Sequence, residues 1–154
     1  MRIVGLDVGE RRIGVAVSDA TGTLARPVGV LKPTGLDARA VELVSAEMQR
    51  LNDGDEEIAS IVVGLPRHLD GSANSMTARV ERFAARLGTH TGLPIVMQDE
   101  RLTSREAESR LALREKDWRV RKERLDAAAA AIILQDYLDT RPGRPVPVAP
   151  DAEF

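Results

Sequence analysis

Three short apolar runs, separated by turn-forming residues, occupy the first third of the chain. They cover residues 2–7, 12–18 and about 24–31. Apolar runs of this length that are bounded by Gly, Asp and Thr are typical of β-strands. Because the connections are short, the pattern predicts an antiparallel meander of three strands.

Helical and strand patterns alternate through the middle of the chain. Apolar residues recur at helical spacing from Leu36 to Leu51 and over about 72–91, which predicts two amphipathic helices. Each helix precedes a short apolar run, at 58–64 and at 93–97. The first of these runs is almost continuously apolar, as in a parallel strand that is buried on both faces. This part of the chain is therefore predicted to continue the sheet with parallel strands.

The last third of the chain is more charged. Hydroxyl and acidic residues from Thr103 to Glu106 predict that a helix begins at about 104. Another helix is predicted over about 125–139, and residues 114–123 between the two are expected to form a charged, mobile connection. Residues 141–154 contain four prolines and are expected to be an irregular tail.

Together these elements predict an α/β fold. Three meandering strands, a crossover helix and two further strands, each followed by a helix, give a five-stranded mixed sheet flanked by helices. This is the ribonuclease H-like order, and we expect one such domain over residues 1–140. Actin-like ATPases share the unit but need two lobes, and 154 residues supply only one. Length therefore favours a nuclease.

Composition narrows the chemistry. The chain has no cysteine, which excludes disulfides and thiolate metal sites and favours a reducing cytoplasm. Its longest apolar stretch, Ala127 to Leu134, is far shorter than the roughly 20 residues of a membrane span, and the N-terminus lacks a signal-peptide layout. We expect a cytoplasmic protein without a membrane partner. The net charge is −2, but residues 110–124 hold seven basic and three acidic side chains.

Acidic residues stand at three places where a metal site would form. Asp7 ends the first strand, and Asp99 and Glu100 follow the fifth. Asp126 opens the last predicted helix, and the alanines after it allow that helix to approach the sheet closely. Two-metal cleavage of a phosphodiester bond needs such a carboxylate cluster, with the ions about 3.5–4 Å apart. Oxygen ligands suit Mg²⁺ or Mn²⁺, and two histidines are too few for a histidine-rich zinc site.

Each acid also has a structural interpretation. Asp7 fits a solvated turn position, and Asp126 fits a helix start, where the helix dipole favours a negative charge. Either Asp99 or Glu100 fits the third position. Asp19, at the end of the second strand, is expected to be a turn residue.

Four segments, in this order, resemble the YqgF/RuvX family: Gly5–Gly9 with Arg12–Asp19, Val63–Pro66 with Asp70–Gly71, Asp99–Ser104, and Asp126–Ala130 with Ile132–Gln135. Members of that family are ribonuclease H-like proteins related to the Holliday junction resolvase RuvC, and they are described as nucleases that process the 5′ end of pre-16S ribosomal RNA. The resemblance therefore implies a cytoplasmic endonuclease that depends on Mg²⁺ or Mn²⁺.

Carried over by position, the resemblance implies roles for individual residues. Asp7, Glu100 and Asp126 match the catalytic acids and metal ligands. The fourth strand ends without the glutamate that RuvC-like enzymes carry there, so Glu100 takes its place. Nucleic-acid contacts are expected from Arg101, at a family motif position, and from the basic residues before Asp126, which are Arg119, Arg121, Lys122 and Arg124.

Several functions stay open on the sequence. The first is cleavage of pre-ribosomal RNA, and the second is resolution of branched DNA by the same backbone chemistry. A non-catalytic module that binds nucleic acid during ribosome assembly and a phosphate-binding, ATPase-like protein are the others. A monomer and a homodimer both fit the sequence.

Overall fold

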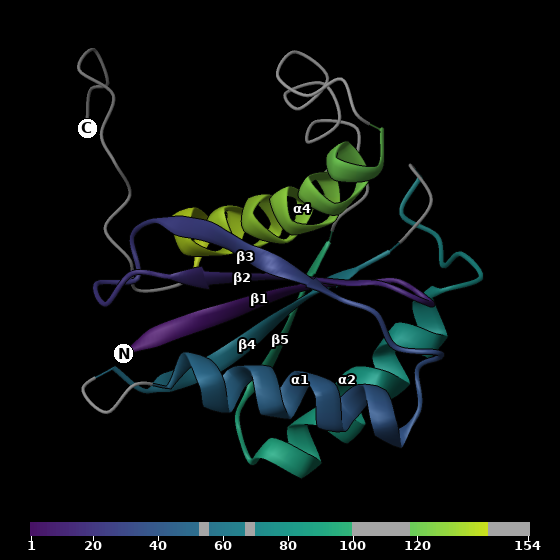
Figure 1. Cartoon of the computed structure of the whole chain (residues 1–154), viewed down its shortest axis with the longest axis horizontal. Helices are drawn as coiled ribbons and strands as arrows, with labels where there is room; N and C mark the ends of the chain where they lie inside the picture. Colours follow the sequence, from purple (N-terminus) through teal and green to yellow (C-terminus); the bar gives the residue numbers. More distant parts are fainter. Residues whose placement is uncertain (53–55, 67–69, 100–117, 142–154) are drawn as a thin grey trace.

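The computed structural model describes residues 1–52, 56–66, 70–99 and 118–141, with the side chains of 118–124 excepted (Figure 1). In chain order, the elements of this part are β1 (Arg2–Val8), β2 (Ile13–Ser18), β3 (Ala25–Leu31), α1 (Ala38–Leu51), β4 (Ile58–Leu65), α2 (Thr77–Thr91), β5 (Ile95–Asp99) and α4 (Trp118–Thr140).

The strands form one sheet in the order β3-β2-β1-β4-β5. β2 is antiparallel to both β1 and β3, whereas β4 is parallel to β1 and to β5. Helices α1 and α2 cover one face of the sheet and α4 covers the other (Figure 1). The predicted five-stranded mixed sheet with flanking helices is confirmed.

Strand β1 lies at the centre of the sheet and serves a separate core on each face. Val4, Leu6 and Val8 belong to the core under α1 and α2. Ile3 belongs to the core under α4. Because successive side chains of a strand point to opposite faces, Asp7 points toward α4.

Two glycines allow α4 to lie unusually close to the sheet. A Cβ atom on Gly14 would overlap the backbone carbonyl of Asp126. A Cβ atom on Gly5 would come to 2.7 Å from Cβ of Leu134 and 3.1 Å from the carbonyl oxygen of Ala130. The three helical residues are spaced four apart, so they form one face of α4. That face rests directly on the backbone of β1 and β2.

Gln135 fixes the other end of this contact. Its Oε1 accepts a hydrogen bond from the backbone N–H of Ala25 at 2.9 Å, and its Nε2 donates to the carbonyl of Thr23 at 2.9 Å. Ala25 begins β3, and Thr23 lies two residues before it. The side chain therefore sets the rotation of α4 about its own axis.

The last helix is longer than its apolar pattern predicts. Helix α4 begins at Trp118, so the expected mobile connection over 114–123 is wrong for residues 118–123. The sequence there contains no proline or glycine, and Arg, Lys, Glu and Leu are good helix formers. The charged composition of residues 118–123 did not exclude a helix, because a helix that extends past the sheet needs no apolar stripe.

Helix α2 is shorter than predicted and begins at Thr77 instead of about 72. Side-chain hydrogen bonds compete with the helix before that point. Asp70 Oδ1 accepts from the backbone N–H of Ser72 at 2.9 Å, and Asn74 Oδ1 accepts from the N–H groups of Met76 and Thr77 at 2.9 and 3.1 Å. Asp and Asn side chains favour turns in this way.

Strand β5 is displaced by two residues from the predicted 93–97. The carbonyl of Pro94 accepts from the N–H of Ile61 at 3.0 Å, and the ladder with β4 begins at Ile95. Asp19 is confirmed as a turn residue, because its Oδ1 accepts from the N–H of Thr23 at 2.7 Å. That hydrogen bond holds the pKa of the Asp19 carboxyl below its ordinary value.

Two sequence predictions fall outside the described residues. They are the helix expected to begin at about 104 and the irregular tail, apart from its first residue. No helix in the described part is long and apolar enough to cross a membrane.

Gly14→Ala tests the close approach. We expect the free energy of unfolding to fall by about 1–3 kcal/mol or more, because the new methyl group meets backbone atoms that cannot move aside. Gly29→Ala in β3 is the control, since a Cβ there has no neighbour within 4 Å, and its effect should stay below about 1 kcal/mol. Urea unfolding of both variants measures the difference, and equal stabilities would contradict the contact.

Candidate functional site

The hairpin between β1 and β2 places several polar side chains at one end of the sheet. Asp7 pairs with Gly14 across the two strands, and the N–H of Gly9 closes the turn by donating to the carbonyl of Arg12 at 2.8 Å. Arg12 and Gly14 are two residues apart, so they share the face on which Asp7 lies. This face is the one covered by α4.

Asp126 reaches the same end of this face from the helix. Its backbone rests on Gly14, the partner of Asp7. Two residues along β1 from Gly5 to Asp7 cover about 7 Å, and four residues along α4 from Ala130 to Asp126 cover about 6 Å. The helix and the strand therefore bring the two carboxylates to the same level of the sheet.

Arg12 supplies a positive charge beside Asp126. Its Nη1 lies 3.6 Å from Asp126 Oδ2, and both atoms are excluded from solvent although the side chains are 35% and 25% exposed. At this separation the guanidinium offsets part of the negative charge on Asp126. Arg12 is thus part of the polar cluster formed with Asp7 and Asp126.

The position of Asp126 inside α4 excludes one of its two interpretations. It was expected to open the helix, but α4 begins eight residues earlier, at Trp118. The influence of a helix dipole on a side chain falls off within the first turn. Asp126 therefore is not a residue placed to stabilise a helix start.

Asp99 lies on the other face of the sheet. It ends β5 opposite Leu65. Ile95 and Met97 pack against the core under α1 and α2, whereas Val96 packs against the core under α4. By alternation Asp99 faces the α1 and α2 side, away from Asp7.

The other expected site residues are only partly covered by the structure. Glu100 and Arg101 lie outside the described residues. Arg119, Arg121, Lys122 and Arg124 fall in the first two turns of α4. Among the described residues, no three His, Asp or Glu side chains gather into a group that could hold a metal ion.

Three residues of this site were not singled out from the sequence. Gly5 and Gly14 carry the close approach of α4, and Arg12 carries the ion pair. The signal that was present is the spacing: a glycine follows two residues after Arg12, and another lies two residues before Asp7. Their importance depends on which helix covers the strands, which spacing alone does not specify.

Comparison with known proteins agrees with this geometry. A family model described as RuvX, Holliday junction resolvase, matches residues 1–140. The chain belongs to the RuvX family. The resemblance seen in the sequence is confirmed, and it covers the same part of the chain.

Curated relatives of this RuvX family member match along nearly their whole length. A protein of Chloroflexus aggregans is 43% identical over 140 residues, which are 90% of this chain and 94% of the relative. A protein of Pelotomaculum thermopropionicum is 39% identical over 145 residues, which are 94% of this chain and 90% of the relative. Both carry the name "Putative pre-16S rRNA nuclease".

Solved structures show the fold that this RuvX family member shares. RuvC of Thermus thermophilus in complex with a Holliday junction substrate has a TM-score of 0.53 and 18% identity, over 93% of this chain and 97% of RuvC. The fowlpox virus resolvase in complex with Holliday junction DNA has a TM-score of 0.51 and 14% identity, over 90% of this chain and 97% of the resolvase. The predicted ribonuclease H-like fold is confirmed.

A double-mutant cycle tests the ion pair of this site. Arg12→Gln, Asp126→Asn and the double variant should give a coupling free energy of about 0.2–1 kcal/mol, because the pair is partly exposed and 3.6 Å apart. The pair between Arg79 and Glu10, which is 38% and 60% exposed, serves as the comparison and should couple no more strongly. Zero coupling in urea unfolding at low salt would contradict the Arg12 contact.

Proposed function

We propose that this RuvX family member is a metal-dependent endonuclease that hydrolyses phosphodiester bonds of structured nucleic acid in the cytoplasm. The observation that carries the proposal is the convergence of Asp7 and Asp126 on one end of the α4 face. Two carboxylates from distant parts of the chain, held together by backbone contact, are what a hydrolytic metal site needs.

The donor atoms fit a hard divalent ion. Asp7 and Asp126 offer carboxylate oxygens, the ligands that suit Mg²⁺ and Mn²⁺. We propose Glu100 as the third ligand, because Asp99 faces the opposite side of the sheet from Asp7 and Glu100 is the neighbouring acid that matches the family's catalytic position. When bound, such ions activate a water molecule and stabilise the leaving oxygen of the phosphodiester.

The residues of the chain have their own parts in this proposal. The close contact between Gly14 and the backbone of Asp126 fixes the distance between helix and strand, so the Asp126 carboxylate keeps its position relative to Asp7. Arg12 orients Asp126 through the ion pair and reduces the repulsion that a phosphate would meet there. Water attack on the phosphorus would leave a 5′-phosphate and a 3′-hydroxyl on the products.

The start of α4 is proposed as a nucleic-acid contact. Arg119, Arg121, Lys122 and Arg124 precede Asp126 on the same helix, and Arg101 follows the proposed ligand in sequence. Contacts from such residues to phosphates add affinity that falls with salt and carry no sequence readout. They position a substrate without selecting it.

We infer pre-16S ribosomal RNA as the substrate, since relatives at about 40% identity over nearly full length carry that name. Branched DNA is the second candidate, because the matching family model is described as a Holliday junction resolvase. The two substrates share one backbone chemistry. A cleavage assay must therefore present both, as an RNA that spans the 5′ end of 16S ribosomal RNA and as a four-way DNA junction.

Asp7→Asn and Asp126→Asn should each reduce cleavage of the preferred substrate by at least about 100-fold, because loss of a ligand exceeds the 10- to 100-fold effect of disturbing its neighbours. Asp19→Asn at the other end of β2 is the matched control and should cleave at the wild-type rate. Initial rates in Mg²⁺ and in Mn²⁺, with circular dichroism to check folding, provide the measurement. Wild-type rates from folded Asp7→Asn would remove Asp7 from the site.

Glu100→Gln and Asp99→Asn separate the two neighbouring acids. Glu100→Gln should lose cleavage as Asp7→Asn does, whereas Asp99→Asn should keep most of it, because adjacent strand residues point in opposite directions. The same rate assay measures both variants, and the metal concentration for half-maximal rate should rise only for Glu100→Gln. The reverse outcome would assign the third ligand to Asp99.

A further inference from the structure

Helix α2 carries three arginines along one side. Arg79, Arg82 and Arg86, here called the arginine stripe, are spaced three and four residues apart, so they lie on one side of the helix. Between Arg79 and Arg86 the helix rises by about 10 Å. Arg86 also lines a groove between α1 and α2, which shows that the stripe lies on the side of α2 that faces α1.

Two of the three arginines in this stripe have no ion-pair partner in the described ranges, although Glu42 lines the same groove as Arg86. Arg82 and Arg86 are exposed and form no ion pair with any residue in the described ranges. Arg50 of α1, by contrast, is neutralised by Glu47, and that contact raises the pKa of Arg50. Helix α2 contains three arginines and a single glutamate, in a chain whose net charge is −2.

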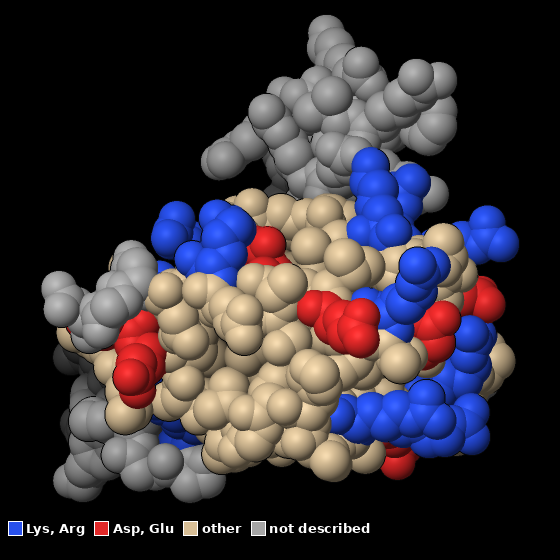
Figure 2. All heavy atoms as spheres, turned by 60° about the horizontal axis from the view of Figure 1, so that its bottom comes forward, with Lys and Arg blue, Asp and Glu red and all other residues tan. Residues whose placement is uncertain are grey.

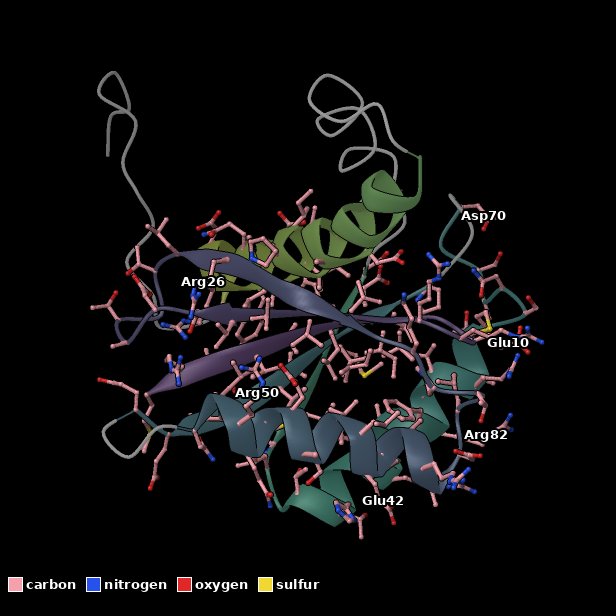
Figure 3. The ribbon with its side chains drawn as sticks, in the orientation of Figure 1. Glu10, Arg26, Glu42, Arg50, Asp70 and Arg82 are labelled. Atoms are coloured by element: carbon pink, nitrogen blue, oxygen red, sulfur yellow. The ribbon has the colours of Figure 1, made fainter. Side chains whose placement is uncertain are left out.

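The stripe begins beside the candidate site. Arg79 Nη1 lies 3.2 Å from Glu10 Oε1, and Glu10 belongs to the turn that joins Asp7 to Arg12. Helices α2 and α4 begin at the same end of the sheet, on opposite faces (Figure 1). Asp70, Glu10 and Arg82 are spread along that end of the molecule in Figure 3.

Figure 2 shows the face formed by α1 and α2, with many Lys and Arg side chains at its right and some Asp and Glu side chains among them. A nucleic acid that lies across the site would pass over the hairpin turn and continue onto this surface. No exposed large hydrophobic residue lies on α2 in the described part of the chain. Protein interfaces usually centre on such residues, so a phosphate backbone fits the surface better than a protein partner does.

We propose that the arginine stripe binds the phosphate backbone of the nucleic acid flanking the cleavage site. The inference rests on the proposed nuclease function and extends its substrate contact to the opposite face of the sheet. About 10 Å of helix corresponds to roughly three nucleotides of one strand when measured along the axis of a duplex, at about 3.4 Å each. Guanidinium groups donate to phosphate oxygens in paired geometry, which makes arginine suited to this role.

The test compares two double variants of equal charge. Arg82→Gln/Arg86→Gln removes the two unpaired charges of the stripe. Arg26→Gln/Arg141→Gln removes two charges from the other end of the molecule, where Figure 3 shows Arg26 and where the Arg141 guanidinium lies beside the turn at Gly22. Fluorescence anisotropy with a labelled RNA hairpin and with a labelled four-way DNA junction gives the dissociation constant over a range of salt concentrations. Circular dichroism establishes that both variants are folded.

We expect the stripe variant to bind more weakly and to lose about 1.4–1.8 from the log–log salt slope, at 0.7–0.9 for each phosphate contact. Both dissociation constants rise between about 50 and 200 mM salt, and the factor of increase is about 7 to 12 times smaller for the stripe variant than for the wild type. The KM for cleavage rises with the dissociation constant. The control variant keeps the wild-type slope.

A stripe variant with the wild-type slope and affinity would overturn the inference, as would an equal loss in the control. The inference would also be overturned if the stripe variant bound an acidic protein more weakly than the wild type does but bound both nucleic acids with unchanged affinity. A wild-type protein that binds nucleic acid through the stripe but does not cleave it would refute the nuclease proposal and support the stripe. Absence of nucleic-acid binding by the wild type would refute both.

Discussion

The close contact between α4 and the first two strands is the constraint on which the rest of the structure depends. Gly5 and Gly14 carry no side chain toward the helix, and the space is filled by backbone atoms of Asp126 and Ala130 and by the side chain of Leu134. A larger side chain at either glycine would push the helix outward. The carboxylate of Asp126 would then move away from Asp7, so the same contact that closes the core also assembles the polar cluster.

Side chains of β1 alternate between the two faces of the sheet, so the strand contributes both to the core and to the candidate site. Leu6 and Val8 are buried under α1 and α2, while Asp7 between them faces α4. The strand is central and pairs with β2 and β4, and Asp7 itself is held in the ladder with β2 opposite Gly14. A site whose residues must keep a fixed geometry benefits from such placement. Gln135 adds a second anchor, which prevents α4 from turning about its axis.

Much of this arrangement could be predicted from the sequence, because strand order and burial follow from the spacing of apolar residues. The start of α4 could not, since the residues before Asp126 are charged and their helix formation leaves no apolar period. The alanines after Asp126 correctly predicted a close approach, although the residue was wrongly placed at the helix start. Gly5, Gly14 and Arg12 are important because they contact α4 residues more than 100 positions away in the sequence. Local sequence patterns do not predict such contacts.

The distribution of charge connects the candidate site with the surface around it. Several acids outside the site have structural tasks: Asp19 holds a turn, Asp37 caps α1, and Glu47 pairs with Arg50. Asp7 and Asp126 instead lie at one end of the same face, where Arg12 pairs with Asp126. A phosphate approaching them alone would be repelled, so the proposed reaction requires divalent cations at the acids. The arginines of the stripe on α2 can then attract the flanking phosphates without competing for the same carboxylates, because they lie on the opposite face of the sheet.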